Sequence, residues 1–194
     1  MSHRFPSVIP LTGLFPAVLF LTGSLSAGLF PGCLFPAGLF PVRVAAAADT
    51  EHRWRIVNVH DGDTVTALDE ANTQHRIRLE GIDAPELGQP FGRVARDRLA
   101  DLAKGKTATI HGHGQDRYGR LLASVEIERE DMGRQLVAEG LAWHYARFSK
   151  DASLAAAERD ARAAGKGLWG DREPVPPWEW RASERDRKRQ PATR

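Results

Sequence analysis

The stretch WRIVNVHDGDTVTALDEANTQHRIRLEGI, residues 54–82, decides the fold of this chain. Its first part, 54–60, is rich in β-branched residues, and an Asp-Gly-Asp turn signal separates it from a similar segment at 64–68. In 75–82, apolar and basic side chains alternate, as they do in a strand that buries one face. Three short strands joined by tight turns predict an antiparallel meander.

The sequence after this meander predicts three helices and two more strands. Apolar residues at helical spacing predict the helices, and alternation of apolar with polar residues predicts the strands. The expected elements are a helix over 91–103, strands over 107–113 and 121–128, a helix around 132–141 and a helix over 153–165 that ends at Gly165. Five short strands interrupted by one helix favour an α+β fold, a five-stranded OB-fold β-barrel with three α-helices.

Residues 1–48 differ in composition from the rest of the chain. They contain no Asp or Glu and only two basic residues, Arg4 and Arg43, around a long apolar run that ends in small residues. This pattern predicts a signal peptide, with the mature protein starting near Asp49. The alternative is an uncleaved membrane anchor, which the repeated prolines of the run disfavour. We therefore expect an exported protein, secreted or periplasmic, that meets a membrane only if this segment is retained.

The end of the chain is dominated by proline and charge, which predicts that residues 171–194 form a largely disordered tail. The alternative for its basic end is a loose electrostatic arm for nucleic acid. Residues 49–170 are then the folded domain. All 25 acidic residues and all but two of the 27 basic residues lie outside 1–48, so the rest of the chain is formally neutral. A site for a polyanion must therefore be a local cluster of basic side chains.

Two aspartates fall at strand ends that the predicted meander brings together. Asp63 begins the second strand and Asp83 ends the third, and adjacent antiparallel strands place such ends close in space. Their like charges repel, so a positive group should lie between them. Carboxylates and main-chain carbonyls are hard oxygen ligands of the kind that calcium selects. Pro85 favours an extended Ala84, which could direct the Ala84 carbonyl at the same ion. Taken singly, each carboxylate could equally be a solvated turn residue.

Basic side chains complete this set. Arg78 lies five residues before Asp83, and a Tyr-Gly turn presents Arg120. Arginine binds phosphate through a planar bidentate fork and stays charged at any relevant pH. A cation and two arginines would stabilise the negative charge that develops on phosphorus, and the remaining carboxylate, Glu86, would position or deprotonate the attacking water. The pattern predicts phosphodiester cleavage.

Several motifs resemble the staphylococcal nuclease (thermonuclease) family. DGDT at 61–64, RLEGIDAPE at 78–86 and DRYGR at 116–120 match it in order and separation. The segments EGLAWHYARF at 139–148 and GKGLWG at 165–170 are similar to the closing segments of that family. The resemblance implies an OB-fold barrel with three helices that binds Ca²⁺ and cleaves DNA and RNA to products with 3′-phosphate ends.

The resemblance also implies a role for individual residues. It makes Asp63 and Asp83 side-chain ligands of calcium, Ala84 a ligand through its backbone carbonyl, Glu86 the residue that acts on water, and Arg78 and Arg120 the phosphate-binding arginines. Arg117 and Tyr118 fall where the family contacts the terminal phosphate or base, and Tyr145 is a candidate for packing on a base. The sequence departs from the best-known member at Ala84, where that protein has threonine, and in a short loop after Glu86.

We therefore expect a calcium-dependent nuclease that acts on DNA and RNA as a monomer, with no stable protein partner. The alternative is a non-catalytic OB-fold module that binds nucleic acid. A calcium-binding protein without a substrate is disfavoured, because Arg78 and Arg120 have no role in holding a cation.

Overall fold

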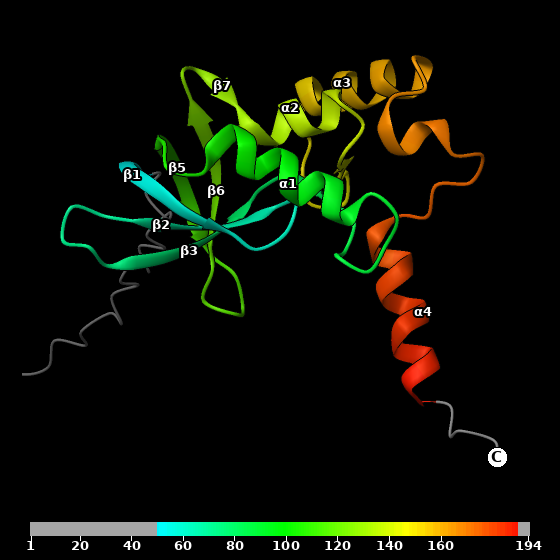
Figure 1. Cartoon of the computed structure of the whole chain (residues 1–194), viewed down its shortest axis with the longest axis horizontal. Helices are drawn as coiled ribbons and strands as arrows, with labels where there is room; N and C mark the ends of the chain where they lie inside the picture. The colour runs from blue at the N-terminus through cyan, green and yellow to red at the C-terminus, as the bar shows by residue number, and fades with distance from the viewer. Residues whose placement is uncertain (1–49, 190–194) are drawn as a thin grey trace, which may run out of the picture. The chain divides into compact units, whose positions relative to one another are not determined.

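The predicted meander forms the first half of a β-barrel (Figure 1). The computed structural model describes residues 50–189. Strand β1 (Thr50–Val59) pairs antiparallel with β2 (Thr64–Leu68), and β2 pairs antiparallel with β3 (Gln74–Leu79). The alternation in β3 buries Ile77 and Leu79 and leaves Arg76 exposed, as the sequence predicts.

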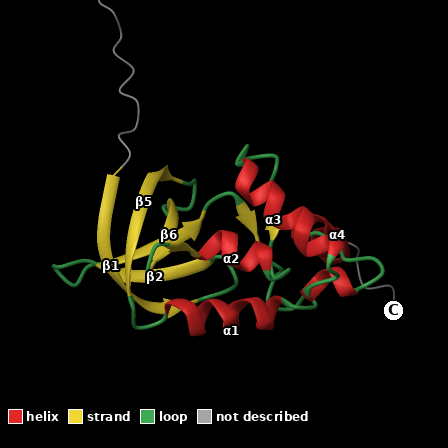
Figure 2. Cartoon of the chain, turned by 90° about the horizontal axis from the view of Figure 1, so that it is seen from above, coloured by secondary structure: helices red, strands yellow, loops and turns green. Residues whose placement is uncertain are grey.

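Two more long strands close the barrel. Strand β5 (Thr107–Gln115) pairs with the outer edge of β1, and β6 (Leu121–Ile127) pairs with β5. Strand β6 then pairs in parallel with β3, which joins the two ends of the sheet. The five-stranded OB-fold barrel is thus confirmed, and Figure 2 shows it on the side of the molecule away from most of the helices. The β3–β6 pairing also brings the start of β6 beside the end of β3, where the predicted site residues lie.

Apolar side chains from all five strands fill the barrel. The core includes residues that solvent does not reach, among them Ile56, Val65, Ile77 and Ile110. Burial of each such side chain contributes roughly 1.5–3 kcal/mol relative to leaving it in water. Helix α1 (Gly92–Ala103) adds Ala95, Leu99 and Ala103 to the same core.

The remaining helices and three short strands lie beside the barrel. They are β4 (Ile82–Asp83), β7 (Glu130–Asp131), α2 (Met132–Ala138), β8 (Trp143–His144), α3 (Ala152–Ala163) and the 3₁₀ turn η1 (Gly167–Gly170). Gly165, just after α3, has a positive φ of 62°, so the helix ends on a left-handed glycine as predicted. Strand β4 pairs with β8 in a separate two-stranded sheet, which fixes the backbone of Asp83.

A fourth helix corrects one prediction. We expected residues 171–194 to be a largely disordered tail, but Pro177–Arg189 form helix α4, which Figure 1 shows in red beyond the end of α1. Residues 50–189 therefore contain one α-helix more than predicted. The predicted leader, 1–48, lies outside the residues that the structure describes. Among residues 50–189, no helix has the length and apolar character needed to cross a membrane.

Candidate active site

Asp63 and Asp83 meet around the guanidinium of Arg78. Nη2 of Arg78 lies 3.0 Å from Asp63 Oδ2 and 3.0 Å from Asp83 Oδ1. Both carboxylates are buried, with 6% of Asp63 and 1% of Asp83 exposed. The predicted convergence of these three side chains is present, and the predicted positive group between the two aspartates is Arg78.

The backbone explains this convergence. Asp63 directly precedes β2, and its carbonyl accepts a hydrogen bond from the Leu79 amide at 2.8 Å, at the end of β3. Arg78 pairs with Thr64 in the β2–β3 register. Arg78 Nη1 also donates to the carbonyls of Leu79 and Ile82, at 2.7 and 3.0 Å. Arg78 therefore fixes the turn that carries the chain from β3 into Asp83.

The turn before β2 is built around Gly62. The Asp61 carboxylate accepts a hydrogen bond from the Asp63 amide at 3.1 Å, so Asp61 stabilises its own loop. A Cβ atom on Gly62 would lie 2.7 Å from the Cβ atoms of both Ala84 and Ala95. Only a residue without a side chain fits between helix α1 and the segment that holds Ala84.

The positive charge beside Asp63 is not enough to keep the pKa of its carboxyl at the ordinary value. Its burial raises its pKa to about 7, and the charge of Arg78, which favours the ionised form, does not offset this effect. The Ala84 amide donates to Asp63 Oδ2 at 2.8 Å, and the Thr64 hydroxyl donates to Oδ1 at 3.1 Å. A second cation beside Asp63 would stabilise its ionised form.

The donor set suits a hard divalent cation. Asp63 and Asp83 offer carboxylate oxygens, and Ala84, which is buried next to both, offers a main-chain carbonyl. Within residues 50–189, no three His, Cys, Asp or Glu side chains gather as a metal site. A cation would therefore depend on two carboxylates, main-chain oxygen and water, which is a set that calcium accepts.

Arg120 reaches the same end of the barrel from the turn before β6. Its Nε and Nη2 bind Asp116 Oδ2 at 2.8 and 2.7 Å, and its Nη1 lies 3.5 Å from the Thr64 hydroxyl. That hydroxyl is bonded to Asp63. The parallel β3–β6 pairing thus brings Arg120 to Asp63 through Thr64, whereas Arg78 contacts Asp63 directly.

Arg117 and Tyr118 lie at the exposed tip of this turn. The Asp116 carboxylate accepts the amides of Tyr118 and Arg120, at 2.8 and 3.0 Å, which fixes the turn. Tyr118 is 69% exposed, and the guanidinium carbons of Arg117 and Arg120 lie 4.7 and 5.6 Å from its ring centre. Arg117 and Tyr118 therefore present positive charge and an aromatic ring to solvent, which suits contact with a nucleic-acid chain.

Glu86 lies on the loop between β4 and α1, with 43% of its side chain exposed. Its amide is 3.2 Å from the Gln89 side-chain oxygen, and its carbonyl closely approaches Gly92, where a Cβ atom would lie 1.8 Å away. The short loop after Glu86 is therefore tightly held. Among the predicted acidic residues, Glu86 is the one that can meet solvent water.

A further arginine, which the sequence did not predict, occupies this site. Arg181 of α4 binds Asp83 Oδ2 at 2.7 Å, Asp83 Oδ1 at 3.1 Å and Glu86 Oε1 at 2.9 Å. Burial would lower the pKa of Arg181, but hydrogen bonds to Asp83 and Glu86 raise it above its ordinary value, so the guanidinium stays charged. The segment PWEWR, 177–181, contains two tryptophans. Such large apolar side chains indicate packing against the domain and could have identified this segment as ordered.

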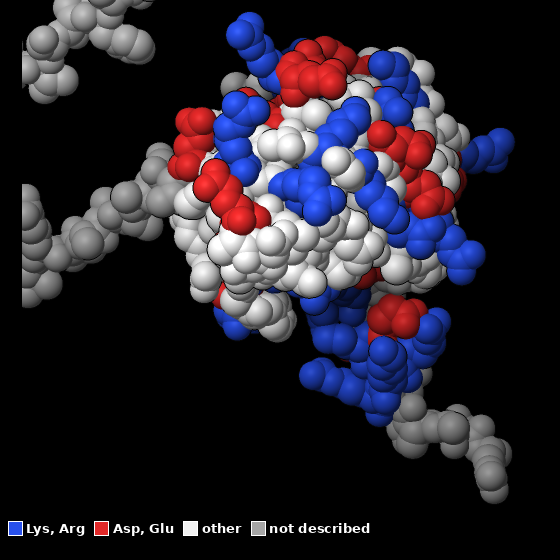
Figure 3. All heavy atoms as spheres, turned by 60° about the vertical axis from the view of Figure 1, so that its left-hand side comes forward, with Lys and Arg blue, Asp and Glu red and all other residues white. Residues whose placement is uncertain are grey.

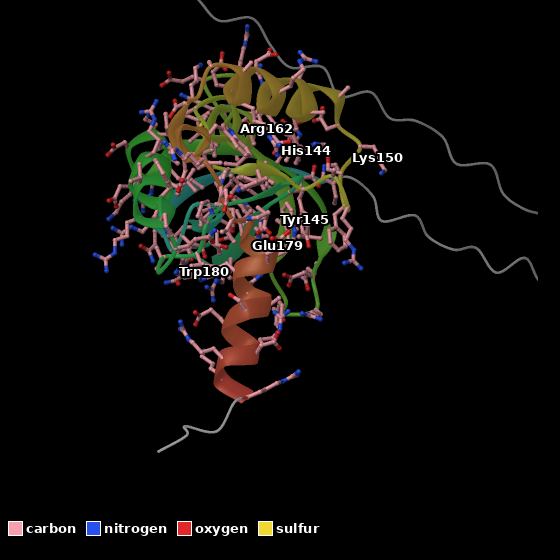
Figure 4. All side chains as sticks on the ribbon, turned by 90° about the vertical axis from the view of Figure 1, so that its right-hand side faces the viewer. His144, Tyr145, Lys150, Arg162, Glu179 and Trp180 are labelled. Carbon is pink, nitrogen blue, oxygen red and sulfur yellow. The ribbon has the colours of Figure 1, made fainter. Side chains whose placement is uncertain are left out.

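Tyr145 also contacts α4. Its amide donates to the Gly81 carbonyl at 2.8 Å, which places Tyr145 near the start of β4. Its ring stacks on Trp178, with ring centres 5.3 Å apart and planes 8° apart. Figure 4 shows Tyr145 above the first turn of α4, which also carries Glu179 and Trp180. Trp178 therefore covers one face of the ring of Tyr145, the candidate residue for packing on a base.

Comparison with known proteins agrees with this geometry. Residues 76–171 match the family model described as staphylococcal nuclease homologue. The chain is 37% identical over 142 residues to a protein of Haemophilus influenzae named "Uncharacterized endonuclease", covering 73% of this chain and 80% of that protein. It is 41% identical over 128 residues to a protein of Escherichia coli O157:H7 with the same name, covering 66% of this chain and 83% of that protein.

A plant relative matches over a smaller share of its length. The "Staphylococcal-like nuclease CAN1" of Arabidopsis thaliana is 40% identical over 110 residues, which is 57% of this chain and 34% of that protein. The matches to the bacterial relatives cover most of each protein, and the barrel carries the motifs that suggested the resemblance. The chain therefore belongs to the staphylococcal nuclease family.

Proposed function

We propose that this protein is a calcium-dependent nuclease that hydrolyses phosphodiester bonds of DNA and RNA and leaves 3′-phosphate ends. The observation that carries the proposal is the meeting of three separate segments: Asp63 before β2, Asp83 in β4 and Arg120 before β6 are linked through Arg78 and Thr64. The names of the bacterial and plant relatives support nuclease activity.

In this proposal, Asp63, Asp83 and the Ala84 carbonyl hold Ca²⁺. A bound Ca²⁺ would supply positive charge to the phosphate oxygens and so stabilise the transition state. Its ordinary ligands are oxygens, as these three groups provide. The hydrogen bond from the Ala84 amide to Asp63 Oδ2, at 2.8 Å, holds these two proposed ligand residues close together.

The other residues act on the phosphate and on water. Glu86 accepts a proton from the water that attacks phosphorus, since it is the carboxylate of the set most open to solvent. The bond from phosphorus to the 5′-oxygen breaks, this oxygen takes up a proton from solvent to become a 5′-hydroxyl, and the phosphate remains on the 3′-oxygen. Arg78 and Arg120 neutralise the charge that develops, while Arg117 and Tyr118 contact the chain beside the cleaved bond.

The proposal extends to the part of the chain outside the described residues. Residues 1–48 would direct export to the periplasm or the medium. Amino-terminal sequencing of the protein recovered outside the cytoplasm tests this directly, and a start near Asp49 is expected. Recovery of the protein only from the cytoplasm would contradict it.

The activity is tested by incubating the full chain with DNA and with RNA, in Ca²⁺ and in a calcium chelator. Cleavage is expected only with Ca²⁺. The 3′ ends of the products should accept an added nucleotide only after phosphatase removes the 3′-phosphate. Glu86→Gln keeps the shape of the side chain and should lower turnover by about 10²–10⁴-fold, because it removes the base. Saturable binding of single strands without any cleavage would instead identify a nucleic-acid-binding module.

A further inference from the structure

We propose that helix α4 is a built-in plug of the active site: Arg181 occupies Asp83, one of the two carboxylates that would bind the cation, together with the proposed base Glu86, and Trp178 covers the ring that would stack on a base. Helix α4 must then leave before Ca²⁺ and substrate bind. This inference rests on the proposed function, since it concerns the same carboxylates.

The first support is the occupancy of Asp83. Its Oδ1 accepts from Arg78 and Arg181, at 3.0 and 3.1 Å, and its Oδ2 accepts from Arg181 at 2.7 Å. The Asp83 carboxylate is otherwise closed off, since its side chain is 1% exposed. A cation bound to Asp83 needs an oxygen that Arg181 holds, and positive charges repel at such distances. Arg181 and a divalent cation therefore exclude one another.

Glu86 is held in the same way. Arg181 Nη1 lies 2.9 Å from Glu86 Oε1, so the proposed base is engaged by a charged donor. A water molecule that approaches this oxygen must compete with the Arg181 guanidinium. The docked helix thus blocks the cation and also obstructs the carboxylate that would activate water.

The second support is independent of charge. Trp178 lies parallel to Tyr145, with 8° between the planes, and also meets Trp143 edge-on at 5.6 Å between ring centres. Aromatic side chains that receive nucleic-acid bases do so by parallel stacking. A base that stacks on the same face of Tyr145 must displace Trp178. One helical turn of α4 therefore covers both the charged and the aromatic parts of the site.

The rest of α4 makes fewer contacts with the domain. Beyond Arg181, residues 185–189 are exposed, and Figure 3 shows Lys and Arg gathered on this projecting part of the molecule. Its basic residues are Arg185, Arg187, Lys188 and Arg189. A helix attached mainly through its first turn can detach locally without unfolding the barrel. A nucleic-acid backbone would offer Arg181 and this basic end an alternative anionic partner.

The expected change in Ca²⁺ affinity follows from competition between α4 and Ca²⁺ for the same site. If the open state is about 1–10% populated, the apparent Ca²⁺ affinity is about 10–100-fold weaker than that of the open site. Arg181→Ala removes the competing guanidinium and should tighten Ca²⁺ binding by that factor. By reciprocity, Ca²⁺ should release α4 in the wild-type chain.

The test uses the full chain, the variant Arg181→Ala and the matched control Arg185→Ala, which removes an exposed arginine one turn further along α4. Calorimetric titration with Ca²⁺ measures affinity without any substrate. Hydrogen exchange of residues 177–189, with and without Ca²⁺, measures release of the helix. We expect tighter binding for Arg181→Ala only, and faster exchange of α4 in the wild type once Ca²⁺ is added.

Two results would overturn the plug: Ca²⁺ affinity in Arg181→Ala equal to or weaker than in the wild type, or exchange of α4 that Ca²⁺ does not change. Loss of cleavage in Arg181→Ala at saturating Ca²⁺ would also contradict it, by showing that Arg181 serves the reaction. The proposed function fails separately: if Arg181→Ala binds Ca²⁺ more tightly but no variant cleaves nucleic acid, the plug is supported and the nuclease is not.

Discussion

The guanidinium of Arg78 is bound to the Asp83 carboxylate at 3.0 Å, and both side chains are largely buried, with 14% and 1% of their surface exposed. The same guanidinium contacts the Asp63 carboxylate. Arg78 therefore lies between two buried carboxylates, those of Asp63 and Asp83. Removing one partner of a buried ion pair leaves uncompensated charge, which is far more destabilising than loss of an exposed pair.

Arg78→Met should therefore lower the free energy of unfolding by about 3–5 kcal/mol. Methionine keeps much of the stem of arginine and removes the charge. Urea denaturation at pH 7 measures the effect. The control is Arg76→Met, two residues earlier on β3, where the side chain is exposed. A loss for Arg78→Met no larger than that for Arg76→Met would show that Arg78 does not neutralise the aspartates.

Substitution of Arg120 tests the proposed catalytic mechanism more than the stability of the fold. Its partner Asp116 also accepts two main-chain amides, so the turn persists without the guanidinium. Arg120→Ala should lower the turnover number by at least about 10²-fold, as loss of one transition-state donor does. Steady-state kinetics with Ca²⁺ measure this, and circular dichroism checks the fold. Arg134→Ala, which removes an exposed ion pair with Glu130, is the control and should keep full activity. Arg120→Ala turnover within a few-fold of wild type would remove Arg120 from the mechanism.

The barrel and its acidic and basic residues could be predicted because their signals are local. Alternation in β3 decides which side chains are buried, and the DGD turn places Asp63 directly before β2. The order of the strands then brings Asp63, Asp83 and Arg120 to one end. The β3–β6 pairing joins distant segments of the chain, so the role of Arg120 follows from the family resemblance of the DRYGR motif and not from local signals alone.

Helix α4 could not be predicted in this way. Its segment is rich in charge and proline, a composition typical of disorder, and its docking depends on contacts such as Arg181 to Asp83, 98 residues apart in the chain. Strands β4 and β8 are two residues each, too short for periodicity to show. In both cases tertiary contacts decide the structure, and composition alone does not reveal them.

Gly62 provides a test of packing at the site. A Cβ atom there would lie 2.7 Å from Ala84 and from Ala95, whereas a Cβ atom on Gly88 would meet nothing within 4 Å. Gly62→Ala should destabilise the fold by about 1–3 kcal/mol through overpacking. It should also lower Ca²⁺ affinity, because Ala84 must move. Thermal unfolding and calcium titration measure the two effects, with Gly88→Ala as the control. Equal melting temperatures for the two variants would contradict the close packing around Gly62.

The ion pair between Arg98 and Glu139 predicts a pH dependence of stability away from the site. Arg98 of α1 binds both oxygens of Glu139, just after α2, at 2.7 Å each. The hydrogen bond from Arg98 lowers the pKa of Glu139 below its ordinary value of 4.5, against the effect of burial. A lowered pKa contributes stability above the unfolded value, and this contribution is lost as the pH falls through the folded value.

Arg98→Ala should thus be less stable than the wild type by about 1 kcal/mol or less at pH 7, since solvent screens this half-exposed pair. The difference should shrink as the pH falls below about 4.5, where Glu139 takes up a proton in the unfolded chain first. Urea denaturation at pH 7 and at pH 3.5 measures both values. Arg96→Ala, which removes a pair with the adjacent exposed Asp97, is the control from the same helix and should show a smaller change between the two pH values. A difference between wild type and Arg98→Ala that stays constant down to pH 3.5 would mean that the Arg98–Glu139 pair contributes nothing to the acid sensitivity of the fold.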